Sequence, residues 1–229
     1  MKTQTKRQSN LRSGIVICGS YGLGNAGDEA ILKAILQEVR ATAPGEEITV
    51  LSRNPAETEA RHSVQAVHMF DIPAWRARMR RARLYINGGG NLIQDVTSRR
   101  SLWYYLFTLR TAKRCGCRVL MYGCGIGPIR NPRDAALTGR TLSRYVDAIT
   151  LREDASAREL HRFGVQGPQV RLSADPALIL PRAEESAVDA LMREYGLDPA
   201  GRYFALCLRS WPGFEEKAPL FAGAVRTAM

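Results

Sequence analysis

The sequence predicts an α/β fold with a mainly parallel sheet and helices on both faces, and three observations support this. Apolar runs of strand length alternate with amphipathic stretches of helical length along the 229 residues. Glycine-rich segments follow three of the apolar runs, at the points where the chain turns toward the next helix. Hydrophobic residues make up 45% of the chain, which is enough for a packed core.

The first predicted unit is a strand, a glycine-rich turn and a helix. Residues 15–18 are an apolar run, and residues 19–28 read Gly-Ser-Tyr-Gly-Leu-Gly-Asn-Ala-Gly-Asp. Apolar residues at helical spacing continue to about residue 41, and Ala43-Pro44-Gly45 ends the helix. Such a turn gathers backbone N–H groups at a helix N-terminus, where an anionic or polyhydroxylated ligand binds readily.

The remaining elements continue the alternation. Strands are predicted at residues 48–51, 64–70, 84–86, 117–122, 148–151, 170–172 and 203–208. Helices are predicted at 55–61, 102–113, 133–145, 155–163, 184–195 and 214–229, with Asp154 as the N-cap of the helix at 155–163. Residues 176–183 contain two prolines and are interpreted as a linker. We therefore divide the chain into a disordered basic arm (1–13), an N-terminal domain (14–180) and a third segment (181–229).

The chain is basic, with a net charge of +11 from 33 basic and 22 acidic residues. This charge suits phosphates, an anionic membrane or nucleic acid, but a generally arginine-rich composition explains it equally well. Five of the eight residues at 76–83 are arginine. We interpret them first as a solvated helix face, and second as a surface for anionic lipid headgroups or a diphosphate. Nucleic acid is not a predicted partner.

The cysteines and the hydropathy pattern indicate a cytoplasmic protein. None of the five cysteines forms a Cys-x-x-Cys pair, so we expect buried free thiols in a reducing compartment. Cys115 and Cys117 lack a matching histidine cluster, so no metal site is predicted. No apolar run approaches the roughly 18 residues of a membrane span. We therefore predict a cytoplasmic location that includes contact with the inner face of the membrane.

The first glycine-rich turn contains Gly22-x-Gly24-x-x-Gly27, the spacing of a dinucleotide-binding fingerprint. Two features argue against a dinucleotide. The second strand ends at Arg53 rather than at an acidic residue for a ribose, although Arg53 leaves NADP open. Asp28 and Glu29 at the helix N-terminus would repel a pyrophosphate. The motifs of phosphate-loop hydrolases and of serine nucleophile elbows are absent.

Four loops follow predicted strands, at residues 19–28, 87–95, 123–128 and 152–154. In a parallel sheet they meet at the edge where ligands bind. Five segments occur in order: the turn at 19–30, Asn-Gly-Gly-Gly-Asn-Leu-Ile-Gln-Asp-Val-Thr-Ser at 87–98, Tyr-Gly-Cys-Gly-Ile-Gly-Pro at 122–128, Thr-Leu-Arg-Glu-Asp-Ala-Ser at 150–156, and Ser-Ala-Asp-Pro-Ala at 173–177. Together they resemble the polysaccharide pyruvyl transferase family, most closely the CsaB type of bacterial cell-wall biosynthesis.

The resemblance implies a glycosyltransferase-B-like fold, in which two Rossmann-like domains form the active site in their cleft. Residues 14–180 would be the first domain, and 181–229 the linker and the incomplete start of the second. The implied activity is transfer of a pyruvyl group from phosphoenolpyruvate to a sugar, as a ketal, with no metal or other cofactor. For the CsaB type the acceptor is N-acetylmannosamine in a lipid-linked wall-polysaccharide precursor, ketalised at positions 4 and 6.

The resemblance and the loop positions give a set of candidate site residues. Arg152 and Arg209 are predicted to bind phosphoenolpyruvate, because a guanidinium suits a carboxylate or phosphate. The alternative for Arg152 is a salt bridge to Glu153 or Asp154. The residues predicted to bind the acceptor are Gly19, Tyr21, Gly22, Asn25, Gly27, Asp28, Gly88, Gly89, Gly90, Asn91, Gln94, Asp95, Gly125 and Gly127. For Asn25, Asp28, Asn91, Gln94 and Asp95 the alternative is that they hold the loops.

Members of the resembled family are longer than this chain. We therefore expect the general acid/base, a histidine and an arginine, to lie beyond Met229. Either this chain is a fragment or a truncated gene product, or a partner, as a homo-oligomer or a separate C-terminal half, supplies the rest. We predict that this chain alone releases no phosphate from phosphoenolpyruvate. Two other functions stay open: a sugar-nucleotide transferase of the same fold, and a non-catalytic module that only binds the acceptor.

Overall fold

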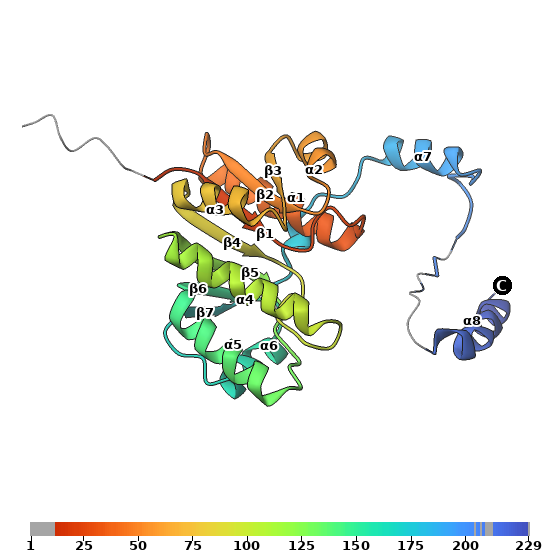
Figure 1. Ribbon diagram of the computed structural model, residues 1–229. Coiled ribbons are helices and arrows are strands. Elements are labelled where there is room, and N and C mark those ends of the chain that lie inside the picture. Colours follow the sequence, from red (N-terminus) through yellow and green to blue (C-terminus); the bar gives the residue numbers. More distant parts are fainter. Residues whose placement is uncertain (1–11, 204, 207, 209–212, 229) are drawn as a thin grey trace, which may run out of the picture. The chain divides into compact units, whose positions relative to one another are not determined.

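The computed structural model describes residues 12–203, 205–206, 208 and 213–228 (Figure 1). Contacts within the chain divide it into two compact units, with the division between Pro181 and Arg182. The first unit contains the whole sheet and both clusters of the hydrophobic core. The second unit contributes two helices to the part of the chain that is described. Each unit is described by itself below.

The first unit is built on a seven-stranded sheet of order β3-β2-β1-β4-β5-β6-β7. All six neighbouring pairs are parallel, which confirms the predicted fold class. The strands are β1 (Ile15–Cys18), β2 (Ile48–Ser52), β3 (Gln65–His68), β4 (Leu84–Gly88), β5 (Arg118–Cys124), β6 (Ala148–Leu151) and β7 (Gln169–Leu172). Parallel neighbours require crossover connections, and helices supply them.

Six helices connect the strands of this unit, and one 3₁₀ turn follows the last strand. They are α1 (Ala26–Thr42), α2 (Pro55–His62), α3 (Ile72–Arg81), α4 (Arg99–Arg114), α5 (Pro132–Tyr145), α6 (Asp154–Arg162) and η1 (Pro176–Ile179). Several begin at residues that favour a helix start. Asn54, Asp71 and Asn131 each cap a helix through the side chain and precede a proline in the first turn.

The core consists of two clusters, one on each face of the sheet. One cluster joins α1 to residues such as Ile17, Val50 and Ile86. The other joins α3, α4, α5 and α6 to residues such as Cys18 and Tyr85, which alternate with the first set along the strands. Because both faces are covered, every residue of β1 and β2 is buried.

Some predicted boundaries are wrong, and each has a local cause. The helix predicted from 102 begins at Arg99, because the Ser98 side chain accepts a hydrogen bond from the backbone N–H of Ser101. β5 continues to Cys124, so the third glycine-rich turn begins after the strand rather than at residue 123. Asp154 is the first helical residue of α6; the N-cap is Glu153, without a capping side-chain bond.

Two segments also differ from the predicted linker and strand. Residues 176–179 form η1, which packs on α1 with Pro176 buried, so this part of the predicted linker belongs to the first unit. The described residues of the strand predicted at 203–208 (203, 205, 206 and 208) adopt no strand. A strand needs a paired neighbour, and the sequence pattern alone supplies none.

The predicted basic arm is described only at its end. The Arg12 guanidinium donates hydrogen bonds to the carbonyl oxygens of Arg80 (2.9 Å) and Cys115, at the C-terminal ends of α3 and α4. Cationic side chains satisfy helix C-terminal carbonyls in this way. Arg12 is therefore an ordered part of the first unit rather than of a disordered arm. Residues 1–11 lie outside the described part of the chain.

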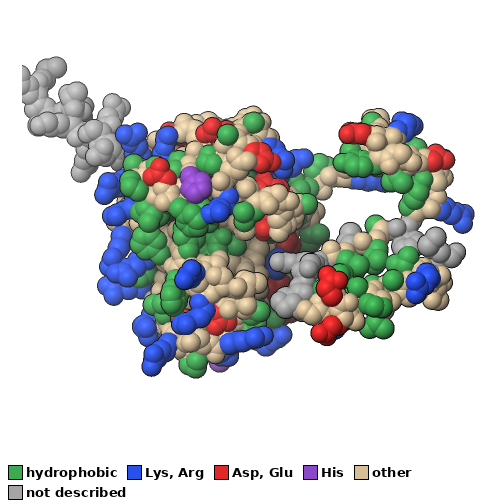
Figure 2. Space-filling view, turned by 45° about the vertical axis from the view of Figure 1, so that its right-hand side comes forward, with side chains coloured by type: hydrophobic (Ala, Val, Ile, Leu, Met, Phe, Trp, Pro, Cys, Tyr) green, Lys and Arg blue, Asp and Glu red, His purple; other side chains and the backbone are tan. Residues whose placement is uncertain are grey.

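The second unit contains α7 (Glu185–Glu194) and α8 (Phe214–Ala228). No side chain of α7 is buried. Within α8 the rings of Phe214 and Phe221 stack, with centroids 5.9 Å apart. Among the residues that the structure describes, no helix has the length and apolar character needed to cross a bilayer. Figure 2 shows that Lys and Arg side chains cover much of the visible surface of the larger unit.

Candidate active site

The order of strands creates a crevice between β1 and β4 at the carboxyl end of the sheet. These two strands are neighbours, but the chain leaves β1 toward α1 on one face and β4 toward α4 on the other. Ligands of open parallel sheets bind at such a switch point. The structure thus brings the loops at 19–25 and 89–98 together, as the sequence predicted, and the loops after β5 and β6 continue the same edge.

The first turn is held by internal hydrogen bonds rather than left open for a ligand. The backbone N–H of Gly22 donates to Glu29 Oε1 (2.8 Å), and the second oxygen of Glu29 lies 3.3 Å from His62 Nε2. A Cβ on Gly22 (φ +74°) would lie 2.2 Å from Ser52 Oγ. Because a carboxylate already occupies this N–H, the turn does not present the donor that a pyrophosphate needs. The geometry argues against the dinucleotide alternative.

Tyr21, predicted to bind the acceptor, is placed in the core. Its side chain is 1% exposed and its hydroxyl donates to the carbonyl oxygen of Gly88 (2.9 Å). A Cβ on Gly19 would collide with the Tyr21 ring at 2.4 Å. These residues shape the turn and fasten it to β4, so the prediction that Tyr21 contacts the acceptor is corrected. Burial raises the pKa of Tyr21, with Cys18 adding to the effect.

Asn25 and Asp28 occupy the start of α1, at the rim of the crevice. The Asn25 side chain caps the helix by accepting from the backbone N–H of Gly27 (3.0 Å), and Asn25 itself is exposed. Asp28 is half-buried. Desolvation raises its pKa and Glu29 adds to the rise, while hydrogen bonding to Ser20 and the charge of Arg152 oppose it. Asp28 therefore holds its proton more tightly than an exposed aspartate.

The three glycines at the end of β4 and just after it are explained mainly by packing on α1. A Cβ on Gly88 would lie 2.5 Å from Tyr21 Oη, and one on Gly89 would lie 2.1 Å from Ile31 Cγ2. Gly89 also has a φ of +60°. Gly90 differs: a Cβ there would meet Asp28 Oδ1 at 3.4 Å, an ordinary van der Waals contact, so its φ of +66° rather than packing favours glycine. Only Gly90 of the three lies beside Asp28.

The loops after β4 and β5 are joined into one unit. The backbone N–H groups of Gly125 and Gly127 donate to the carbonyl oxygens of Gly90 (2.9 Å) and Ile93 (2.7 Å). The Asn91 amide donates to the Gly127 carbonyl oxygen at 2.7 Å. These contacts extend the pairing of the two strands beyond their ends. The site floor is therefore rigid backbone rather than two independent loops.

Two further predicted acceptor residues also hold these loops. The Asp95 carboxylate accepts hydrogen bonds from the backbone N–H groups of Arg130 and Asn131, each at 2.9 Å. Gln94 binds within its own loop, to Thr97 and to the backbone N–H of Val96. Holding the loops was the alternative role given to these side chains, and the contacts in the structure are of that kind.

Arg152 lies at the end of β6 within a cluster of carboxylates. Its Nε donates to Glu153 Oε2 (3.0 Å) and its Nη1 to Asp175 Oδ2 (2.9 Å), so the salt bridge to Glu153 is present. Burial opposes the charge of Arg152, but Asp175 and Glu153 outweigh it and raise the pKa of the guanidinium. Ser156 Oγ donates to Glu153 Oε1 (2.8 Å) and fixes that side chain. Arg152 is therefore held in one orientation.

Gly125 keeps the space beside Arg152 open. A Cβ there would lie 3.0 Å from Glu153 Oε1 and 3.2 Å from both Nε and Nη2 of Arg152. Within the described residues, Nη2 donates no hydrogen bond. Gly127, in contrast, is needed because a Cβ would lie 2.5 Å from Glu159 Oε2. The guanidinium of Arg152 thus lies close against Gly125, and a glycine is the residue that allows this approach.

Sequence reasoning missed two polar residues at this edge. Asp175 follows β7 and pairs with Arg152, and its position directly after a strand was the available signal. Asn87 is fully buried at the end of β4, and its amide atoms have no hydrogen-bond partner in the described part of the chain. Arg209, predicted to bind phosphoenolpyruvate, lies outside the described residues.

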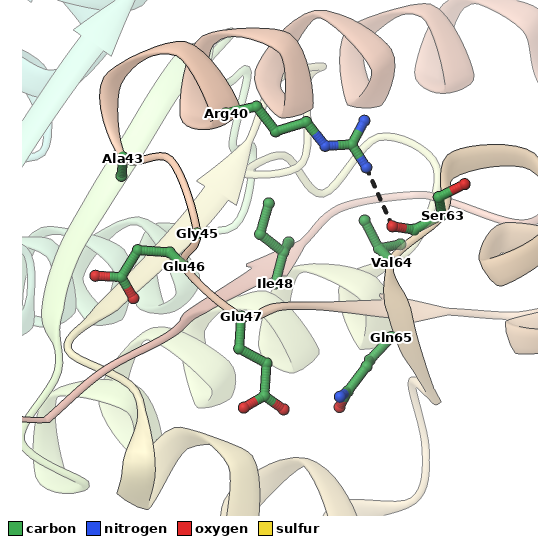
Figure 3. Close-up of a pocket in the computed structure, with 9 residues that line it drawn as sticks. All are labelled: Arg40, Ala43, Gly45, Glu46, Glu47, Ile48, Ser63, Val64 and Gln65. Atoms are coloured by element: carbon green, nitrogen blue, oxygen red, sulfur yellow. Dashed lines mark hydrogen bonds between the residues drawn. The ribbon is translucent and has the colours of Figure 1, made fainter.

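The hollow in Figure 3 does not belong to this site. It has a volume of about 460 Å³ and lies where α1 ends and β2 begins, at the opposite edge of the sheet. Arg40 there donates to the carbonyl oxygens of His62 and Ser63. Glu46 and Glu47 pair with arginines outside the hollow. Its polar groups serve the structure. In the described residues, no group of three or more His, Cys, Asp or Glu side chains is placed to hold a metal ion.

The fold and the site define a class: a Rossmann-like first domain of the glycosyltransferase-B-like type, with its polar residues at the carboxyl edge of a parallel sheet. The family model of polysaccharide pyruvyl transferases matches residues 25–222. The chain belongs to that family.

Comparison with solved structures supports the fold. The Anabaena protein Alr3699/HepE in complex with UDP-glucose superimposes with a TM-score of 0.51 at 9% identity, over 80% of this chain and 50% of that one. The hypothetical protein SMU.573 from Streptococcus mutans gives a TM-score of 0.43 at 13% identity, over 76% and 63%. This chain therefore spans about half the length of the first of these. No curated protein matched the chain.

Proposed function

We propose that the edge formed by the loops after β1, β4, β5 and β6 binds phosphoenolpyruvate and a polysaccharide sugar for pyruvyl transfer. The observation that carries the proposal is the position of Arg152 beside Gly125. Its guanidinium is fixed by two carboxylates through Nε and Nη1, and within the described residues Nη2 donates no hydrogen bond. Membership of the family supplies the reaction class. The whole reaction would also involve residues other than those described here.

The donor would meet Arg152 through its carboxylate or its phosphate, since both accept charge-assisted hydrogen bonds. Arg152, Glu153 and Asp175 together carry one positive and two negative charges. A trianionic donor therefore requires further cations, and Arg209 is our candidate. Glu153 and Asp175 would act by orienting the guanidinium, which lowers the entropy lost when the donor binds.

The acceptor sugar would contact Asp28, which lies beside Gly90 at the start of α1. A carboxylate accepts hydrogen bonds from sugar hydroxyls, and its raised pKa makes Asp28 a better proton acceptor than an exposed aspartate. Gly90 and Gly125 are joined by a backbone hydrogen bond, so the two halves of the proposed site share one rigid floor. The donor and acceptor would thus lie on adjacent loops.

The proposed chemistry has two bond-forming steps. Protonation of the methylene carbon of phosphoenolpyruvate makes carbon 2 electrophilic, and one sugar hydroxyl attacks it and loses its proton. The bond between carbon 2 and the phosphate oxygen then breaks, and a second hydroxyl closes the ketal. Of the two hydroxyl protons, one balances the proton added to the methylene carbon and the other leaves with phosphate.

The proposal is tested by titrating the chain with phosphoenolpyruvate in a calorimeter. Wild type should bind it, and Arg152→Ala should weaken binding about 10- to 100-fold, because a charge-assisted hydrogen bond is lost. Arg162→Ala is the matched control, since Arg162 also pairs with a glutamate, on the neighbouring helix α6. It should bind like wild type. UDP-glucose is titrated in parallel.

Two results would contradict the proposal. Equal affinity of wild type and Arg152→Ala for phosphoenolpyruvate would show that Arg152 does not bind the donor. Tighter binding of UDP-glucose than of phosphoenolpyruvate would favour the sugar-nucleotide alternative. Circular dichroism spectra of both variants should match that of wild type, so that a loss of affinity is assigned to the site.

A further inference from the structure

We propose that the outward face of α3 and α4 docks onto an anionic lipid bilayer. We call it the α3–α4 face and define it by Arg76, Arg80, Trp103, Phe107, Arg110 and Arg114. It lies on the side of the sheet covered by α3 and α4. The proposal goes beyond the proposed function, because it concerns a surface and a partner that the transfer chemistry does not require.

The positive charge of the chain is concentrated on these two helices. Residues 72–81 and 99–114 contain nine Arg or Lys residues and no Asp or Glu, whereas the net charge of the whole chain is +11. Three of the nine form ion pairs, namely Arg78, Arg99 and Lys113. The other six are exposed and have no carboxylate partner among the described residues. A solvated helix usually balances its charges, so this surplus needs a partner.

The exposed side chains of α4 form one continuous stripe. Arg100, Trp103, Phe107, Arg110 and Arg114 are spaced by three or four residues, which places them on the same side of the helix. A helix of 16 residues is about 24 Å long. The stripe therefore places two aromatic rings between cations along one side of the unit, next to the arginines of α3.

The aromatic rings of the stripe are held in place with part of their surface in water. Trp103 and Phe107 are 44% and 42% exposed. The indole N–H of Trp103 donates to Asp134 (3.0 Å), and the Phe107 ring packs against the buried Trp75. Because these contacts fix the rings, the remaining apolar surface stays directed outward. Exposed apolar surface of this kind marks an interaction site.

A hollow between the two helices suits a phosphate headgroup. It measures about 350 Å³ and is surrounded by Arg76, Arg80, Arg114 and Phe107, with Thr111 and Cys115. The first three supply positive charge and Phe107 an apolar wall. In Figure 2, blue side chains gather along the left margin of the larger unit.

The combination of residues favours a bilayer over other anionic partners. Arginines attract the anionic headgroups, and Trp and Phe side chains enter the boundary between headgroups and acyl chains. A flat surface can contact a straight helical stripe along its whole length. The N-terminal end of α4 also follows the loop that contains Asp95, so a bilayer on this face would run up to the edge of the candidate active site.

The test is cosedimentation of the full chain with lipid vesicles. Wild type should bind strongly to phosphatidylcholine vesicles that contain about one third phosphatidylglycerol. It should bind much more weakly to vesicles of pure phosphatidylcholine. The variant R80Q/R110Q/R114Q should lose on the order of 100-fold in partition coefficient, since each arginine near an anionic surface contributes about fivefold. Phe107→Ala should also weaken binding, which a purely electrostatic contact does not explain.

The matched control is K33Q/R158Q/R171Q. It removes three exposed cations on α1, α6 and β7 that have no ion pair among the described residues, and it should bind nearly as well as wild type. The proposal is overturned if the partition coefficient of the control falls as much as that of the first variant. It is also overturned if wild type binds vesicles with and without the anionic lipid equally. Tighter binding of a single-stranded RNA than of the vesicles at equal salt would assign the face to nucleic acid instead. All variants should keep the wild-type circular dichroism spectrum.

Discussion

Asp28 illustrates how much a single residue depends on its surroundings. It stands in the first turn of α1, where a carboxylate is normally stabilised by the helix dipole. In the folded chain it is half-buried, and desolvation raises its pKa despite the hydroxyl of Ser20 and the charge of Arg152. The ionised form of Asp28 therefore lowers the stability of the fold, as expected of a residue kept for a ligand.

The linkage gives a prediction for Asp28→Asn. A group whose pKa is higher in the folded state adds stability below the unfolded pKa, and this stability is lost as the pH rises through the folded pKa. At pH 7 the carboxylate is a cost, so the variant should have a higher Tm than wild type. The difference should shrink as the pH falls toward 4. Thermal unfolding followed by circular dichroism at both pH values measures it.

Asp154→Asn is the control for this prediction. Asp154 also occupies the first turn of a helix, α6, but it is exposed. Its removal should lower stability by about 0.5 kcal/mol through the lost dipole interaction. A lower Tm for Asp28→Asn at pH 7 would show that the carboxylate is stabilised in the fold and would exclude the desolvation argument.

At the scale of elements, the glycine segment after β4 shows how packing can imitate a binding motif. Three successive glycines suggest a close approach of ligand to backbone. In the structure Gly88 and Gly89 instead let β4 and its turn approach Tyr21 and Ile31, whereas Gly90 faces Asp28. Three identical residues in a row are therefore explained in two different ways. Which explanation applies depends on the side of the turn that each glycine occupies.

Gly89→Ala should test the packing reason. Its Cβ would lie 2.1 Å from Ile31 Cγ2 and its φ is +60°, so overpacking and backbone strain together should cost about 2–4 kcal/mol. Gly24→Ala is the control: its φ is +71°, but no atom lies within 4 Å of the added Cβ. It should cost about 1 kcal/mol. Urea unfolding at equilibrium measures both, and equal costs would contradict the steric explanation.

At the scale of the whole molecule, the first unit contains a complete core. All buried residues of the two clusters, and the partly buried residues packed on them, lie before Pro181. The last contacts come from η1, where Pro176 is buried and α1 is its packing partner. Domains with their own core fold independently. The predicted boundary at residue 180 remains a prediction until it is tested.

A chain that ends at Pro181 should therefore keep a cooperative thermal transition. A second chain that ends at Ser173 loses η1 and the Asp175 partner of Arg152, and its Tm should fall by several degrees, since about 1 kcal/mol corresponds to 2–4 °C at this size. Differential scanning calorimetry compares the two. Loss of the transition in the longer chain would show that the core needs residues after 181.

Much of the fold was predictable because the local pattern of apolar residues in the sequence indicates which residues are buried. The apolar runs at 15–18 and 48–51 are strands buried on both faces, and Pro55 begins a helix as expected. The described residues of the strand predicted at 203–208 form no strand, because strand formation also needs a neighbour to pair with. The site was predicted at the level of loops. The pairing of Arg152 with Asp175, 23 residues later, was not, because it depends on where β7 lies beside β6.

The sequence by itself determined the alternation of strands and helices, the parallel sheet and the family, because periodicity and ordered motifs are properties of the chain. The tertiary structure decided the order of the strands, and with it the crevice between β1 and β4. It also decided that Gly88 and Gly89 pack against other residues and that the Asp28 carboxylate is partly removed from water. The same holds for the ion pairs that orient Arg152. These depend on contacts between residues far apart in sequence, and side-chain periodicity carries no information about such contacts.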